Sequence, residues 1–170
     1  KDGEHVLIMF AGIGPFAFVI AREKTANIIA VEWNPDAIEY MKESLLLNKK
    51  LKGNIVPILG DVRKVVPTKF SNWADRIIMP LPKTADSFLD IAVIASKSNA
   101  LIHTYVFMDS RSWKSDLEPW LEKRCNEICN KLGHNIKLKL ESAHIVRPYA
   151  PKIVQIGIIL KVTKIKLNNL

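Results

Sequence analysis

The fold of this chain is decided by the stretch Val6-Leu7-Ile8-Met9-Phe10-Ala11-Gly12-Ile13-Gly14-Pro15-Phe16. An apolar run with the length of a buried strand passes through two glycines into a helix-compatible segment, Ala17 to Glu23. Glycine has no side chain to obstruct a ligand, so a ligand can lie against the main chain where the first helix amides are free. The stretch predicts a nucleotide-type pocket, although a glycine turn alone also occurs for purely geometric reasons.

An acidic residue at the end of the second apolar run strengthens this interpretation. The run Asn27-Ile28-Ile29-Ala30-Val31 ends at Glu32, about 20 residues after the glycine turn. An acid in this place can accept hydrogen bonds from both hydroxyl groups of a ribose. Because Asn34-Pro35 follows and begins a new helix, an ordinary exposed carboxylate is the less favoured interpretation.

The rest of the chain alternates short apolar runs with longer helix-compatible stretches, which is the pattern of parallel strands joined by crossover helices. The predicted strands are 6–10, 27–32, 54–59, 75–79 and 101–108, and the predicted helices are 14–23, 35–48, 84–97 and 114–132. The last two apolar runs, Ile136 to Val146 and Lys152 to Val162, have no helix between them. We therefore expect an antiparallel edge hairpin whose connection is residues 147–151.

Composition limits the class of protein. A chain of 170 residues suits one compact domain. Its formal net charge of +8 attracts a polyanion such as RNA, but selection for solubility produces such a charge as well. The sequence has no run of about 18 apolar residues and no signal pattern, so we expect a cytoplasmic protein without a membrane span. Cys125 and Cys129 lack further ligands at metal spacing, so we expect helix packing and no structural metal.

Three segments in a characteristic order carry a resemblance to a known family: Phe10-Ala11-Gly12-Ile13-Gly14-Pro15-Phe16, Val31-Glu32-Trp33-Asn34-Pro35-Asp36-Ala37-Ile38 and Leu45-Leu46-Leu47-Asn48-Lys49. The chain resembles the archaeal and eukaryotic tRNA guanosine-37 N1-methyltransferases. The likeness continues through Gly60-Asp61-Val62-Arg63, Met79-Pro80-Leu81-Pro82 with Phe88-Leu89-Asp90, and Tyr149-Ala150-Pro151. It implies an α/β, Rossmann-like class I methyltransferase with S-adenosylmethionine as cofactor and tRNA as partner. The implied sheet has seven mostly parallel strands, an antiparallel carboxyl-terminal hairpin and helices on both faces.

The resemblance also assigns a cofactor site at the carboxyl ends of the strands. The two glycines would pass under the methionine part, Glu32 would hold the ribose, and Trp33 would pack on the adenine or merely cover a helix. Asp61 would accept from the adenine amino group or instead cap the following turn, and Val62 would add an apolar contact or an amide. The predicted cofactor-binding residues are Phe10, Ala11, Gly12, Gly14, Glu32, Trp33, Asn34, Asp61, Val62 and Pro80.

The loop after the fourth strand, Met79-Pro80-Leu81-Pro82, is identified with the family's Asn-Leu-Pro loop. Its two prolines make it stiff, or only punctuate the chain. Pro80 stands where the family has asparagine, so base recognition must use other groups. Tyr149 would stack on an RNA base or pack within the hairpin. The predicted substrate-binding residues are Pro80, Leu81, Pro82, Arg147 and Tyr149, and the candidate RNA-facing cations are Lys49, Lys50, Lys52, Arg63, Lys64, Lys83, Arg111, Lys114 and Arg147.

Methylation of N1 of guanine needs alignment with the sulfonium and a base for the N1 proton. No carboxylate in this sequence has a strong claim to be that base, and the resemblance implies a catalytic glutamate and arginine upstream of the first strand. We therefore expect a monomeric catalytic-domain fragment that lacks amino-terminal tRNA-binding parts. Two alternatives stay open: the related wybutosine-pathway aminocarboxypropyl transferase, and a cofactor-binding or RNA-binding module without turnover.

Overall fold

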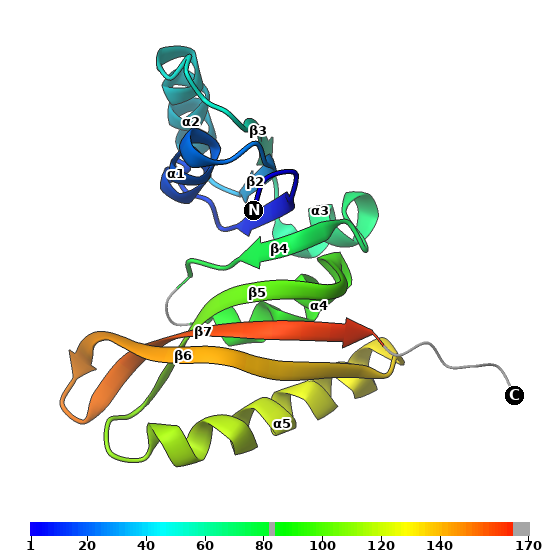
Figure 1. Cartoon of the computed structure of the whole chain (residues 1–170), viewed down its shortest axis with the longest axis vertical. Coiled ribbons are helices and arrows are strands. Elements are labelled where there is room, and N and C mark those ends of the chain that lie inside the picture. Colours follow the sequence, from blue (N-terminus) through cyan, green and yellow to red (C-terminus); the bar gives the residue numbers. More distant parts are fainter. Residues whose placement is uncertain (82–83, 165–170) are drawn as a thin grey trace, which may run out of the picture.

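Seven strands form one sheet in the computed structural model, which describes residues 1–81 and 84–164 (Figure 1). The strand order is β3-β2-β1-β4-β5-β7-β6. The strands are β1 (His5–Met9), β2 (Asn27–Glu32), β3 (Asn54–Leu59), β4 (Ala74–Ile78), β5 (Ser96–Asp109), β6 (Ile136–Ala150) and β7 (Ile153–Lys164). The helices are α1 (Pro15–Glu23), α2 (Pro35–Leu47), α3 (Val62–Lys69), the short 3₁₀ helix η1 (Ala85–Phe88), α4 (Leu89–Ala95) and α5 (Trp113–Leu132).

The sheet is parallel from β3 to β5 and antiparallel at the carboxyl-terminal end. Strand β1 pairs in parallel with both β2 and β4, whereas β7 pairs antiparallel with β5 and with β6. The predicted fold class, including the terminal hairpin, is confirmed. Because the chain crosses from β3 back past β1 to β4, the strand order reverses beside β1, and ligands bind at the carboxyl edge of such a point.

Helices cover the sheet on both faces, and the alternation along β1 shows how. Leu7 and Met9 enter one core with residues of α3, α4 and α5, whereas Val6 and Ile8 enter a second core with residues of α1 and α2. Successive side chains of a strand point to opposite faces, so a strand that is apolar at every position must be covered twice. The predicted buried strand Val6 to Met9 is therefore covered on both faces.

The predicted elements differ from the structure in three places. Helix α3 was not predicted, and the predicted helix 84–97 is instead η1, α4 and the start of β5. The predicted loop 147–151 is wrong, because β6 continues to Ala150 and pairs with β7 up to Ile153. Pro148 is tolerated there because β6 is an edge strand whose pairing shifts register between Pro148 and Ala150.

Candidate functional site

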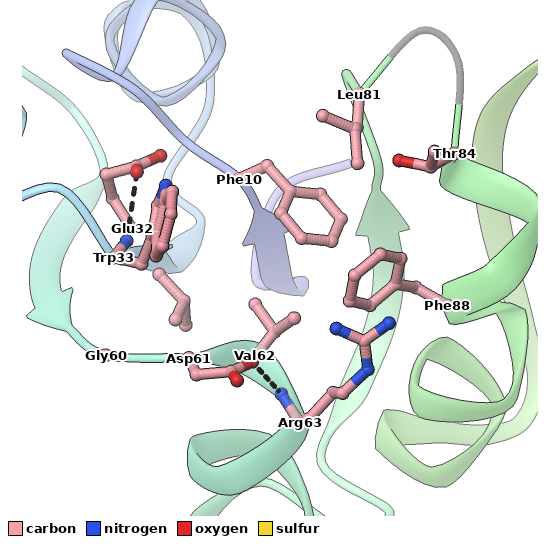
Figure 2. A pocket seen from close by; sticks show the side chains of 11 residues that line it. Phe10, Glu32, Trp33, Gly60, Asp61, Val62, Arg63, Leu81, Thr84 and Phe88 are labelled. Carbon is pink, nitrogen blue, oxygen red and sulfur yellow. Dashed lines mark hydrogen bonds between the residues drawn. The ribbon is translucent and has the colours of Figure 1, made fainter.

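The carboxyl ends of β1, β2 and β3 surround a cavity of about 310 Å³ (Figure 2). Most of its wall is apolar, and its polar side chains come from the last residue of β2, from the residues after β3 and from the residue before η1. An apolar cleft with a few convergent polar groups is the usual form of a small-molecule site. The lining residues are Phe10, Val31, Glu32, Trp33, Gly60, Asp61, Val62, Arg63, Leu81, Thr84 and Phe88.

The turn after β1 bends sharply through three residues with left-handed backbone angles. The φ angles are +60° at Phe10, +56° at Gly12 and +85° at Gly14. A Cβ at Gly14 would lie 3.0 Å from Cγ of Met41, whereas one at Gly12 would meet nothing within 4 Å. Gly14 is therefore required for packing as well as for its backbone angles, and it is the residue from which α1 begins.

The carboxylate of Glu32 binds the turn to β2. Its Oε2 accepts a hydrogen bond from the amide of Gly12 at 2.8 Å, and its Oε1 accepts from the amides of Trp33 and Asn34 at 2.9 Å each. The residue is only 7% exposed. A carboxylate has about four acceptor positions, so these three bonds leave one on Oε2. The predicted pair of ribose contacts stays a prediction, and the remaining acceptor position suits one ribose hydroxyl.

Asp61 begins helix α3. Its Oδ1 accepts a hydrogen bond from the amide of Arg63 at 2.8 Å, which is the arrangement of a helix cap. The expectation that Asp61 caps the following turn is therefore confirmed. The cap uses Oδ1 only, and within residues 1–81 and 84–164 the structure gives no hydrogen bond to Oδ2 or to the amide of Val62. An acceptor and a donor thus lie side by side at the cavity.

Phe10, Phe88 and Arg63 contact one another through their side chains, with Phe88 between the other two. The rings of Phe10 and Phe88 meet edge to face, with centres 4.7 Å apart. The guanidinium carbon of Arg63 lies 3.7 Å from the centre of the Phe88 ring. Figure 2 shows Glu32 and Trp33 at one end of the cavity and Arg63, Phe88 and Thr84 at the other.

The remaining predicted cofactor residues lie around this cavity in different ways. Trp33 lines it while being 79% exposed, which is unusual for so large an apolar side chain. Asn34 caps α2 by accepting from the amide of Asp36 at 3.0 Å. Ala11 is buried behind the turn, and Pro80 is not among the lining residues, although its neighbour Leu81 is. Pro82 lies outside the described residues.

The two predicted substrate residues on the hairpin lie on strand β6 and away from this cavity's wall. The side chain of Arg147 donates from Nε to Oε1 of Gln155 at 2.9 Å across the strand pair. The ring of Tyr149 meets that of Phe107 edge to face at 4.7 Å. Both side chains therefore take part in packing between strands, and their contact with RNA stays a prediction.

The sequence does not assign Gly60, Arg63, Thr84 or Phe88 to the predicted cofactor site, although all four line this cavity. Gly60 and Arg63 flank the predicted Asp61-Val62 pair, so position after β3 was the available signal. From the sequence, the charge of Arg63 indicates only an RNA-facing cation. Thr84 and Phe88 carry no such signal, since they reach the cavity from η1 and the segment before it.

Comparison with known proteins decides the family. A family model described as the TRM5/TYW2 methyltransferase domain matches residues 1–137, which is more than half of the chain. The chain belongs to this family. The resemblance seen in the sequence motifs is thereby confirmed, and the matched segment contains every residue that lines the cavity.

The chain is similar to two relatives whose names give different activities. The chain is 38% identical over 163 residues to the tRNA (guanine(37)-N(1))-methyltransferase Trm5b of Pyrococcus abyssi, covering 96% of this chain and 45% of that protein. It is 38% identical over 104 residues to the tRNA(Phe) (4-demethylwyosine(37)-C(7)) aminocarboxypropyltransferase of Methanocaldococcus jannaschii, covering 61% of this chain and 40% of that protein. The chain thus spans less than half the length of these two relatives.

Solved structures agree with the fold. The crystal structure of Trm5b from Pyrococcus abyssi matches with a TM-score of 0.77 and 37% identity, over 96% of this chain and 45% of that one. The structure of TYW2 from M. jannaschii in complex with AdoMet matches with a TM-score of 0.79 and 28% identity, over 97% of this chain and 71% of that one.

Two further observations concern the described part of the chain, residues 1–81 and 84–164. It contains no group of three or more His, Cys, Asp and Glu side chains placed to hold a metal ion. None of its helices has the length and apolar character needed to cross a membrane.

Cys125 and Cys129 pack against the core from α5, and both thiols donate to the carbonyl oxygen of Ile136.

Proposed function

We propose that this chain binds S-adenosylmethionine in the cavity and transfers its methyl group to N1 of guanosine 37 of tRNA, as the catalytic domain of a longer enzyme. The observation that carries the proposal is the similarity to P. abyssi Trm5b, 38% identity across 96% of this chain, which spans the whole cavity. The net charge of +8 supports a polyanionic partner.

The residues at the cavity fit this cofactor. The acceptor position left on Glu32 suits a ribose hydroxyl, and Oδ2 of Asp61 with the amide of Val62 offers an acceptor and a donor to a nucleobase. Trp33 supplies an exposed aromatic face for stacking. The bound cofactor would supply an electrophilic methyl group, so the protein's task is to align the acceptor nitrogen with it and to exclude water.

The N1 proton of guanine needs an acceptor that the described cavity does not offer. Glu32 is engaged by three backbone amides, and Asp61 caps α3. A carboxylate that holds the main chain in this way is poorly placed to accept a proton and release it on each turnover. We therefore assign the general base to a residue outside this cavity.

The test is a binding measurement followed by product analysis. Calorimetric titration with S-adenosylmethionine should show saturable binding, and Trp33→Ala should weaken it by roughly 5- to 100-fold, the range seen for loss of aromatic stacking. Tyr40→Ala is the matched control, because Tyr40 is also exposed, at 60%, but does not line the cavity. No binding to the folded chain, or equal losses for the two variants, would contradict the proposed pocket.

A second candidate function is aminocarboxypropyl transfer, which the similarity to the M. jannaschii aminocarboxypropyltransferase favours. Pro80, in place of the asparagine expected from the family motif, is consistent with altered chemistry at this loop. Incubation of the longer enzyme with tRNA and cofactor distinguishes the two functions. A methyl group adds about 14 Da to the nucleoside and an aminocarboxypropyl group about 101 Da, because different substituents of the sulfonium are attacked.

A further inference from the structure

The side chain of Arg63 is held beside the cavity but is not neutralised there. Its guanidinium group lies 3.7 Å above the ring of Phe88, and Phe88 is itself 9% exposed and fixed by Phe10. Among residues 1–81 and 84–164 the structure shows no hydrogen bond or ion pair to this guanidinium. Stacking on an aromatic face orients an arginine without consuming its N–H donors, so those donors remain available to a ligand.

The nearest carboxylate in sequence does not pair with this cation. Asp61 accepts from the backbone amide of Arg63, and the arginine side chain extends to Phe88 (Figure 2). Asp61 and Arg63 thus present a free acceptor and free donors from either side of Val62 to one cavity. Such a pair is suited to a flat ligand that carries a donor next to an acceptor.

We propose that Arg63 determines specificity for the base of the cofactor, by donating to a ring nitrogen of adenine while Asp61 accepts from its amino group. The proposal rests on the proposed function. With the ribose at Glu32, the base lies between Trp33 at that end of the cavity and Arg63 at the other (Figure 2). Adenine has an amino donor flanked by two acceptor nitrogens. Hypoxanthine has a carbonyl acceptor in place of the amino group, so it places an acceptor opposite the acceptor of Asp61.

The experiment is a chemical double-mutant cycle on the whole 170-residue chain. Calorimetry measures binding of S-adenosylhomocysteine, its 1-deaza and 7-deaza analogues, and S-inosylhomocysteine. The proteins are the wild type, Arg63→Met, Arg63→Lys and Lys69→Met. Met keeps an unbranched apolar stem but has no donor, and Lys69→Met is the control for loss of one exposed charge on the same helix.

We expect Arg63→Met to weaken S-adenosylhomocysteine binding by about 5- to 100-fold, with Arg63→Lys intermediate and Lys69→Met close to wild type. One of the two deaza analogues should bind the wild type more weakly than S-adenosylhomocysteine, by a similar factor. For that analogue, the affinity of Arg63→Met should equal the affinity of the wild type. S-inosylhomocysteine should bind the wild type more weakly than S-adenosylhomocysteine does. The ratio of these two affinities should be smaller in Arg63→Met than in the wild type.

The assignment would be overturned if the losses of binding free energy from Arg63→Met and from each deaza substitution were additive. Additive losses would mean that the Arg63 side chain does not contact either ring nitrogen. Unchanged S-adenosylhomocysteine binding with weaker binding of an anticodon stem-loop RNA would overturn it as well, and would place Arg63 on the RNA. Absence of S-adenosylhomocysteine binding to the folded wild type would refute the proposed function itself, and the Arg63 assignment with it. Unfolding midpoints in urea confirm that every variant is folded.

Discussion

Replacing Glu32 by glutamine should destabilise the protein, although glutamine has the same shape and the residue lines the proposed cofactor cavity. The carboxylate accepts hydrogen bonds from three backbone amides, two of them at Oε1 and one at Oε2. The amide oxygen of glutamine can keep the two bonds from Trp33 and Asn34. Its NH₂ group then faces the amide of Gly12, so one charge-assisted hydrogen bond becomes a contact between two donors. Such a loss at a site that is 7% exposed costs about 1.5–3 kcal/mol.

Urea unfolding followed by circular dichroism measures this cost, and Glu43→Gln is the matched control. Glu43 is exposed on α2, so its substitution should change the free energy of unfolding by less than about 0.5 kcal/mol. Glu32→Ala removes both acceptor oxygens and with them all three hydrogen bonds, so it should cost roughly 3–5 kcal/mol, more than Glu32→Gln. If Glu32→Gln were as stable as the wild type, the carboxylate would not hold the turn and the reasoning would be refuted.

Two further predictions follow from backbone geometry and from burial. Gly14→Ala should cost about 2–3 kcal/mol, and Gly12→Ala only about 1 kcal/mol, because both need left-handed φ but only Gly14 would press on Met41; equal urea midpoints would contradict this. Burial and the adjacent Arg76 lower the pKa of His103 to about 4. The unfolded imidazole therefore binds a proton at a higher pH than the folded one, so stability should fall by about 1–2 kcal/mol between pH 6.5 and pH 4, after allowance for solvent screening. The fall should be smaller in His103→Gln, which still offers Arg76 an acceptor; identical pH profiles would contradict the assignment.

The parallel half of the fold could be predicted because its strands are apolar on both faces. Continuous runs such as Val6 to Met9 allow few alternatives to a buried strand, and glycine or Asn-Pro marks the helix starts that follow. Helix α3 could not be predicted from its composition, since it has Pro67 within its eight residues and a strongly polar outer face. Its start is fixed by the Asp61 cap, which from sequence alone is indistinguishable from a ligand contact.

The carboxyl-terminal half was harder to predict because a proline there is compatible with a loop and also with an edge strand. Arg147-Pro148-Tyr149-Ala150-Pro151 looks like a loop when each proline is taken to end a strand. An edge strand needs backbone donors on one side only, so Pro148 can sit in β6 where the ladder shifts register. The actual turn lies at residues 151–152, where Lys152 has a left-handed φ of +65°. Lysine has no preference for this conformation, so the sequence does not indicate the turn. Sequence placed Arg147 and Tyr149 near one another, but not their partners Gln155 and Phe107.

The contacts of Glu32 also determine which experiments can identify the cofactor site. Loss of cofactor binding in Glu32→Ala would not show a contact to the ribose, because the same substitution releases the turn that forms the cavity wall. Trp33 and Arg63 are better probes, since one is 79% exposed and the other makes no hydrogen bond through its side chain in the described structure. Their removal leaves the backbone in place, so a change in affinity reports on the ligand. Residues that sequence motifs emphasise most can thus be the least informative to substitute, because they build the site as well as line it.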